Sequence, residues 1–300
     1  MRHYRSGVLG AILFALALLA SACGSGEDSG TKEGPTITIG SANFSENALV
    51  AEIYAQVLET NGYTVERNLE IGNREVYNAA VISGDVDLVP EYVGSALANQ
   101  GGTPTADSAA TAQALRDAWA DKGVAVLDPA PAQSKNAIVV RQDTADALGL
   151  SQVSDLAEYT DLVFGGPPEC PERQFCLIGL TEVYGLSFAD FKPLDVGGAL
   201  TVAALESDEI QVGLLFTSDD VIATKGFVLL EDDKRLQPAE NLIPLIRQDI
   251  ITAYGDDIVN KLNEISAALT TAELSEMNRR MGIDGDDRVT VAKDWIADNL

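Results

Sequence analysis

One arginine stands among two cysteines and three prolines in the stretch GPPECPERQFC, Gly166 to Cys176. A planar guanidinium suits a carboxylate, because its paired N–H donors match the two carboxylate oxygens. Prolines and a closed cysteine pair would both restrict the loop that carries Arg173. The stretch therefore raises the question of which anionic group a guanidinium held in this way would bind.

The first residues indicate an exported protein. MRHYRSGVLGAILFALALLASAC has a positive start, an apolar run from Val8 to Ala20 and small residues before Cys23, which is the pattern of a secretory signal peptide. The apolar run is too short to span a bilayer comfortably. A cysteine directly after small residues resembles a bacterial lipobox, although Ala20 stands where leucine is usual. We expect residues 1–22 to be a signal peptide and Cys23 to carry a lipid; ordinary cleavage that leaves Cys23 free is the alternative.

The next residues, GSGEDSGTKEGP, are rich in glycine, serine and charge, so residues 23–35 are predicted to be a flexible tether. If Cys23 is acylated, Cys170 and Cys176 are the remaining thiols, and an exported pair this close is expected to form a disulfide. Closing so short a loop adds about 2 kcal/mol in the chain-entropy model. Its main effect would be to fix the loop around Arg173, or, in the alternative, merely to order a surface loop.

The composition argues against several functions. A formal net charge of −26 would repel nucleic acid and anionic lipid headgroups, so no nucleic-acid partner is expected. The single histidine, His3, leaves with the signal peptide, which removes His-assisted hydrolysis and most zinc chemistry. No metal site and no cofactor are predicted. A secreted hydrolase that uses two carboxylates stays an alternative, although the sequence contains no motif for one.

From Thr36 onward the chain alternates strand and helix patterns. TITIGS precedes helical SENALVAEIYAQVLETNG, strand patterns return in NAIVVRQ, DLVFGGPP and IQVGLLFTS, and the end is helical through VTVAKDWIADNL. VDLVPEYVGSALANQ is predicted as a short buried strand that breaks at Pro90 into a turn and a helix. The alternation predicts an α/β fold with mostly parallel sheets. A mature body of roughly 265 residues suits two lobes.

The stretch GSANFSENALV places a strand end, a turn and a helix N-terminus in succession, with Ser45 as the candidate N-cap. A helix N-terminus at the carboxyl edge of a parallel sheet can receive the polar end of a ligand. Plain helix capping is the alternative, because every α/β protein has several such ends.

Four stretches together resemble one family: GSANFSENALVAEIYAQVLETNGYTVER, SGDVDLVPEYVGSAL, GPPECPERQFCLIGLTEVYGL and VLLEDDKRLQPAENLIPLIRQD. They resemble the substrate-binding proteins of ABC importers for glycine betaine, carnitine and choline, in order and from about Thr36 to the C-terminus. The resemblance implies a type II periplasmic-binding-protein fold, in which two α/β lobes joined by two crossovers close on a ligand in the cleft. Residues 36–137 and 240–300 would form lobe 1, and residues 138–239 lobe 2.

The resemblance also implies a ligand site. In this family a quaternary ammonium lies among several aromatic rings, while an arginine and other donors hold the ligand's carboxylate. Arg173 stands where the family's ligand arginine stands, so proline and disulfide would pre-organise a carboxylate clamp. Tyr92 of PEYVGS matches one ring position, and Phe216 of LLFTSDD stands where a second tyrosine is usual. The other ligand-binding residues expected are Ser95, which replaces a threonine, Asn136, Asn43 and Thr217.

The rest of the site departs from the family pattern. Ala42 stands where a lysine is frequent, and Asn136 and Val202 stand at about the third and fourth ring positions. Half of the aromatic cage is therefore missing. Either other rings fill the gaps, or the pocket has changed to a larger or less cationic ligand. The rings considered are Trp119, Tyr77 and Phe44, and for the first two simple packing is the more common role.

Together with the export signal, the resemblance implies a monomeric, non-enzymatic binding protein on the outer face of the cell membrane, anchored there through lipidated Cys23. It would capture a small zwitterionic or quaternary-ammonium solute and deliver it to an ABC permease that a separate ATPase drives. Ligand contacts from both lobes would stabilise the closed state. A binding or sensor domain for an unrelated ligand, such as an aromatic metabolite, stays an alternative.

Overall fold

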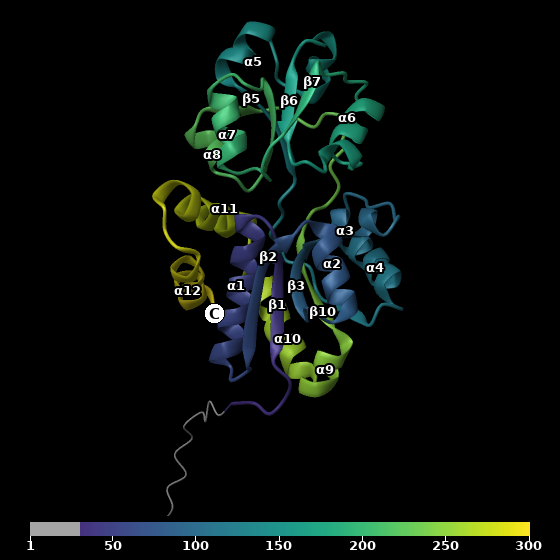
Figure 1. Ribbon diagram of the computed structural model, residues 1–300, viewed down its shortest axis with the longest axis vertical. Helices are drawn as coiled ribbons and strands as arrows, with labels where there is room; N and C mark the ends of the chain where they lie inside the picture. Colours follow the sequence, from purple (N-terminus) through teal and green to yellow (C-terminus); the bar gives the residue numbers. More distant parts are fainter. Residues whose placement is uncertain (1–30) are drawn as a thin grey trace, which may run out of the picture.

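The computed structural model describes residues 31–300 as two α/β lobes connected by two chain segments (Figure 1). The expected signal peptide, Cys23 and most of the expected tether lie outside the described residues. Within residues 31–300, no helix is both long and apolar enough to cross a membrane. The two-lobe α/β arrangement agrees with the sequence prediction.

The first lobe is built on a five-stranded sheet in the order β2-β1-β3-β10-β4. β1 pairs in parallel with β2 and β3, while β10 runs antiparallel between β3 and β4. The parallel strands end at the cleft, where the ligand edge of an α/β sheet is expected. The strands are β1 (Ile37–Ala42), β2 (Val65–Gly72), β3 (Leu88–Tyr92), β4 (Val124–Val126) and β10 (Leu242–Arg247).

The second lobe has a five-stranded sheet of matching design, in the order β7-β6-β8-β5-β9. β6 pairs in parallel with β7 and β8, and β5 runs antiparallel between β8 and β9. The strands are β5 (Asn136–Arg141), β6 (Val163–Gly166), β7 (Asp190–Pro193), β8 (Val212–Phe216) and β9 (Phe227–Leu229). The strands thus divide between the lobes close to the predicted boundaries at 137 and 239, and the exact boundary residues stay a prediction.

The prediction of mostly parallel sheets was wrong, because half of the strand pairings in each sheet are antiparallel. The two exceptional strands, β5 and β10, are the first strands of the chain after each crossing between lobes. A strand that directly follows a crossover starts near the cleft and runs away from it, whereas the other long strands run toward the cleft. Its direction is therefore set by the crossover, which a local sequence pattern does not reveal.

The strand predicted to break at Pro90 instead continues to Tyr92, and α3 (Val93–Asn99) begins directly after it. Pro90 lies opposite Pro244 of β10. Val93 N–H donates to the Asn241 carbonyl in the same ladder. In an antiparallel ladder, hydrogen-bonded and non-hydrogen-bonded residue pairs alternate. Val93 and Asn241 form a hydrogen-bonded pair, so Pro90 and Pro244, three positions along, form a non-hydrogen-bonded pair that needs no N–H donor between these two strands.

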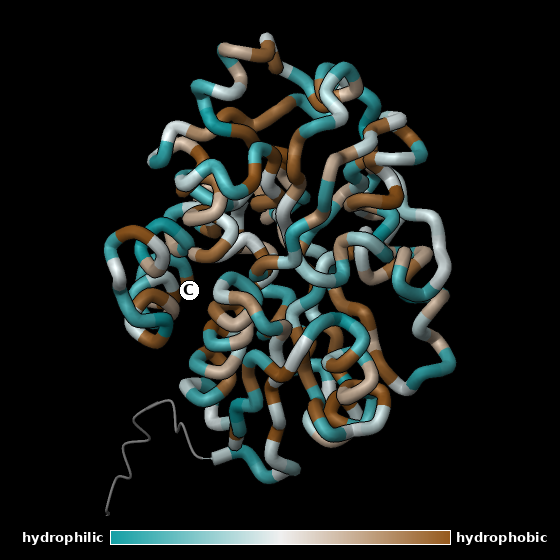
Figure 2. The backbone as a smooth tube through the Cα atoms, turned by 45° about the horizontal axis from the view of Figure 1, so that its top comes forward, coloured by the Kyte–Doolittle hydropathy of each residue, from teal (hydrophilic) through white to brown (hydrophobic). Residues whose placement is uncertain are grey.

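Helices cover both faces of each sheet, and four buried apolar clusters fill the layers between. In Figure 2 hydrophobic segments run through the interior of both lobes, and most of the hydrophilic segments lie toward the outside. The helices of lobe 1 are α1 (Ser45–Thr60), α2 (Arg74–Ser83), α3, α4 (Ser108–Trp119), α9 (Gln248–Tyr254), α10 (Asp256–Ala268), α11 (Thr271–Arg279), the π-helical η3 (Arg280–Asp284) and α12 (Arg288–Asn299). Those of lobe 2 are α5 (Gln142–Leu148), η1 (Val153–Glu158), η2 (Cys170–Glu172), α6 (Leu177–Glu182), α7 (Ala199–Glu206) and α8 (Val221–Thr224).

Substitution of Trp119 tests the packing of the first lobe, because its side chain is fully buried in the apolar cluster that α3 and α4 cover. Trp119→Ala should lower the free energy of unfolding by about 3–5 kcal/mol through lost contacts and a cavity. Urea unfolding followed by circular dichroism measures the loss. Trp119→Phe, which keeps a ring in the core, is the matched control and should lose clearly less. Equal stability of the alanine variant and the wild type would contradict the core assignment.

Candidate functional site

A cavity of about 380 Å³ lies between the two lobes. Lobe 1 contributes the end of β1, the start of α2 and the β3–α3 corner, and lobe 2 contributes the disulfide loop and the end of β8. The two crossovers add Ser134, Asn136 and Glu240 to the wall. The cavity is thus enclosed by both lobes and by the segments about which they would turn.

The predicted disulfide between Cys170 and Cys176 is present, and both cysteines are buried. Arg173 lies midway, and its main chain is bonded to both of them. Its N–H donates to the Cys170 carbonyl at 3.1 Å, and its carbonyl accepts from Cys176 N–H at 3.2 Å. The disulfide therefore fixes the backbone from which the guanidinium projects.

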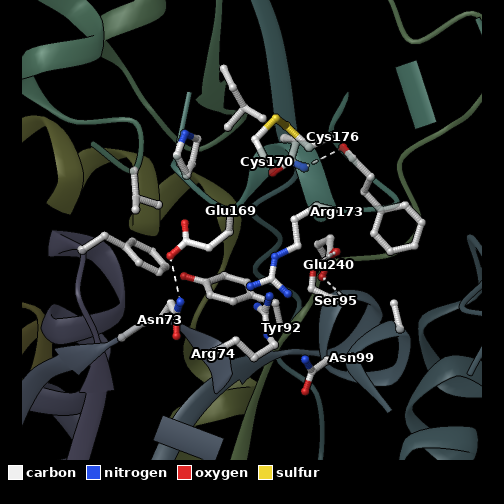
Figure 3. A pocket seen from close by; sticks show the side chains of 18 of the residues that line it. Asn73, Arg74, Tyr92, Ser95, Asn99, Glu169, Cys170, Arg173, Cys176 and Glu240 are labelled. Atoms are coloured by element: carbon white, nitrogen blue, oxygen red, sulfur yellow. Dashed lines mark hydrogen bonds between the residues drawn. A yellow bond between two sulfur atoms is a disulfide. The ribbon is translucent and has the colours of Figure 1, made fainter. Parts of the chain in front are cut away.

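The Arg173 guanidinium points into the cleft, as Figure 3 shows. It donates two hydrogen bonds, of 2.6 and 2.7 Å, to the carboxylate of Glu75 on α2 of the opposite lobe. This guanidinium lowers the pKa of Glu75 below its usual value. The arginine predicted to clamp a ligand carboxylate holds a carboxylate of the protein, and the pair spans the cleft.

Three aromatic rings form a row across the cleft. Phe44, directly before α1, stacks on Tyr92 of lobe 1 with centroids 6.0 Å apart and on Phe216 of lobe 2 with centroids 5.8 Å apart. All three line the cavity. Phe44 occupies the N-cap position of α1, so the prediction of Ser45 as N-cap was wrong: the chain turns one residue earlier, which aims the ring at the cleft.

The other rings considered have different surroundings. Tyr77 lines the cavity but is buried, and its hydroxyl donates to Glu91. Trp119 belongs to the core of lobe 1 and is not part of the cavity lining. Val202, at the fourth ring position, packs with the core of lobe 2. Five rings line the cavity: Phe44, Tyr92 and Phe216 form the stacked row, and Tyr77 and Phe175 lie outside it.

Six of the seven residues predicted to bind ligand line this cavity: Arg173, Tyr92, Phe216, Ser95, Asn136 and Asn43. The amide of Asn136 donates to the Phe175 carbonyl at 2.9 Å, which ties β5 to the disulfide loop. Thr217 does not line this cavity. It follows β8, and its hydroxyl accepts a hydrogen bond from the main-chain N–H of Lys135 on the first crossover. Thr217 lines a second cavity of about 570 Å³. A direct role for each of these residues in ligand binding stays a prediction.

Sequence reasoning missed the charged groups of the cavity floor. Arg74 of α2 pairs with Glu91, a fully buried carboxylate in β3. Glu240, also buried, accepts from Ser95 N–H at 3.0 Å and from Ser95 Oγ at 2.6 Å. Burial raises the pKa of Glu240 to about 7. The available signal was an acid inside or beside an apolar strand pattern, in LVPEY and PAENLIPL.

A second polar cluster joins the lobes near the crossovers. Glu46 of α1 accepts hydrogen bonds from Tyr92, from Ser218 beyond β8 and from Asn278 of α11. Asp219 lies beside this cluster and accepts from Phe216 N–H at 2.8 Å. Burial, and secondly the nearby Glu46, raises the pKa of Asp219 to about 8.

Comparisons with known proteins agree with this geometry. Residues 35–298 match the family described as the substrate-binding domain of ABC-type glycine betaine transport systems. The chain is 26% identical to the glycine betaine-binding protein YehZ of Escherichia coli (strain K12) over 274 residues, which cover 87% of this chain and 89% of that protein. It is 27% identical to a glycine-betaine-binding protein of Pseudomonas aeruginosa over 294 residues, covering 94% and 93%.

Among solved structures, one described as a glycine betaine/carnitine/choline ABC transporter matches with a TM-score of 0.69 at 20% identity. The match covers 89% of this chain and 98% of that one. At this identity the likeness shows the fold, and it confirms the predicted type II periplasmic-binding-protein architecture.

The raised pKa of Asp219 makes stability depend on pH. The folded state holds a proton up to about pH 8 that the unfolded chain releases near its ordinary pKa of 3.8. The stabilisation is therefore complete below about pH 4 and declines as the pH rises toward 8. Asp219→Asn, which is neutral at every pH, should remove this decline. Between pH 5 and pH 8 the wild type should lose at least about 1 kcal/mol more than the variant, or about 2–4 °C in Tm.

Thermal unfolding monitored by circular dichroism at several pH values measures the difference. Asp220→Asn is the matched control, since it neutralises the neighbouring carboxylate on the same segment, and it should follow the wild-type profile. Parallel pH profiles for the wild type and Asp219→Asn would show that Asp219 titrates normally.

Proposed function

The chain belongs to the family of substrate-binding domains of ABC-type glycine betaine transport systems, and from that premise we propose that it captures a small zwitterionic or quaternary-ammonium solute of the glycine betaine, choline and carnitine class. It delivers this solute to an ABC permease that a separate ATPase drives. The observation that carries the proposal is the cleft itself, where a fixed guanidinium and a row of rings face one cavity from both lobes.

The two ends of such a solute find different partners in this cleft. The carboxylate takes the place of Glu75 on Arg173, because both present the same pair of oxygens to the guanidinium. The cationic end lies against the rings of Phe44, Tyr92 and Phe216, where a desolvated cation gains about 1–2 kcal/mol per good contact. Since Arg173 belongs to lobe 2 and Tyr92 to lobe 1, one bound solute holds both lobes in the closed state.

The remaining parts of the proposal concern the setting of the protein. It acts outside the cytoplasm as a monomer, anchored to the outer face of the membrane by a lipid on Cys23. It catalyses no reaction: ligand binding, hinge closure and release to the permease are its whole cycle. The lipobox-like residues before Cys23 support the anchor.

A second candidate is the same scaffold with a different cargo. Phe44, Tyr92 and Phe216 stack on one another in a row across the cleft. A flat or less cationic molecule can bind along such a row. This candidate keeps the transport role and changes the ligand class.

Arg173 provides the direct test of the proposed site. Glycine betaine, carnitine, proline betaine, choline and several aromatic compounds are added to the purified protein in a thermal-shift series. A true ligand at a hundred times its Kd adds about 2.7 kcal/mol, which raises Tm by a few degrees. Arg173→Ala should weaken binding of carboxylate-bearing ligands at least tenfold, because it removes a charge-assisted hydrogen-bond pair worth about 1.5–3 kcal/mol.

Arg141→Ala is the control, since Arg141 pairs with Asp143 and Asp208 and does not line the cavity. Silence of every betaine, carnitine and choline together with a shift from an aromatic compound would favour the second candidate. Silence of all compounds would reject both.

Glu75 tests whether a protein carboxylate competes with the ligand. Glu75→Gln leaves Arg173 without its ionic partner, so glycine betaine should bind more tightly by up to about fivefold, in line with a contribution of at most about 1 kcal/mol for a partly exposed pair. Choline has no carboxylate and should bind with unchanged affinity, which makes it the internal control. Calorimetric titration gives both constants. Weaker binding of glycine betaine would mean that Glu75 itself contacts the ligand.

A further inference from the structure

Glu240 is a buried carboxylate at the edge of the ligand cavity. It lies on the second crossover, just before β10, with 4% of its surface exposed, and it forms part of the cavity wall. Figure 3 shows it beside Ser95, which holds its two oxygens through one main-chain and one side-chain hydrogen bond. Its position is thus fixed by the first turn of α3.

Close packing holds this carboxylate in place. A Cβ at Gly94 would lie 2.5 Å from the Ala239 carbonyl oxygen and 3.2 Å from Cδ of Glu240. The crossover therefore packs directly against the backbone of α3.

No cation of the cavity wall neutralises Glu240 in an ion pair. The two guanidinium groups that line the cavity are paired with other carboxylates, Arg74 with Glu91 and Arg173 with Glu75. A buried carboxylate without a directly paired cation is unfavourable, because it has lost water and the charge of Arg74, which is paired with Glu91, compensates it only in part. Burial is the main cause of the raised pKa of Glu240, and the Ser95 hydrogen bonds and the charge of Arg74 offset it only in part.

The acceptor sites of Glu240 also exceed the donors that the protein supplies. A carboxylate has about four lone-pair positions, and Ser95 fills two of them. A trimethylammonium group brings positive charge but no N–H, so it leaves the other acceptors unsatisfied. A protonated amine brings both the charge and the hydrogen bond.

We infer that Glu240 is a specificity-determining residue, which selects zwitterionic solutes whose cationic nitrogen keeps at least one N–H over their fully methylated counterparts. The inference rests on the proposed function, because it assigns a ligand class to the same cleft. Glu240 comes from the lobe 1 side and Arg173 from lobe 2, and both line the cavity, so Glu240 provides an acceptor for an amine and Arg173 a donor pair for a carboxylate.

Two ligand pairs that differ by a single methyl group test the inference. N,N-dimethylglycine and glycine betaine share a carboxylate, and dimethylethanolamine and choline share a hydroxyl; in each pair one member keeps an N–H. Isothermal titration calorimetry on the purified protein gives four dissociation constants at pH 7.5. The N–H member of each pair should bind at least tenfold more tightly, and Glu240→Gln should reduce each ratio below about threefold.

The control is Glu172→Gln, which removes an exposed carboxylate from the same cavity wall and should leave both ratios unchanged. Ser95→Ala keeps the charge of Glu240 and frees one acceptor site, so it should preserve or increase the preference even if Glu240→Gln folds poorly. Equal or tighter binding of glycine betaine by the wild type overturns the inference while the proposed function stands. A preference that survives in Glu240→Gln also overturns it. Failure of all four ligands to bind rejects the proposed ligand class, and with it this inference.

Discussion

The arrangement of the two lobes depends on the hydrogen bonds that the buried Glu46 carboxylate accepts. It accepts from Tyr92 in lobe 1, from Ser218 at the end of the second sheet and from Asn278 in the C-terminal helices. Three segments that are distant in sequence are thus held by one side chain at the start of α1. The ring row follows from it, because Tyr92 and Phe216 can flank Phe44 only when these segments meet. Ser134 extends the cluster to the first crossover through its contact with Ser218.

Charge pairing gives the cleft its chemical character. The protein carries many more acids than bases, and each guanidinium of the cavity wall has a carboxylate partner. Glu91 is fully buried and Arg74 is partly buried on one side of the cleft, so their pair is a permanent part of the floor. Arg173 and Glu75 meet across the cleft and stay partly exposed, so their pair can exchange for a ligand. An arginine–carboxylate ion pair therefore stabilises the cavity floor at Arg74 and Glu91, and forms a contact that a ligand can replace at Arg173 and Glu75.

Local sequence patterns predicted the succession of strands and helices, and the family resemblance supplied the fold. Cys170 and Cys176 were also predictable, since the export signal and the cysteine count left few other pairings. The directions of β5 and β10 were not, because they depend on the crossovers and not on hydrophobic period. The partners of Arg173 and Ser95 were equally out of reach: Glu75 is separated from Arg173 by 98 residues, and Glu240 from Ser95 by 145. Contacts over such separations are set by packing, and one sequence alone does not encode them in a readable pattern.

The inner positions of β5 and β10 have a mechanical consequence. Each crossover leads into a strand that has hydrogen-bonded neighbours on both sides, β8 and β9 in one lobe, β3 and β4 in the other. A torque applied at a crossover is therefore spread through the centre of a sheet instead of peeling an edge strand from it. Each sheet then moves as a rigid body, and rotation of one lobe against the other is confined to the short segments between the sheets. A small displacement of side chains at the cleft is therefore converted into a movement of a whole lobe, and a partner protein can recognise the resulting conformation.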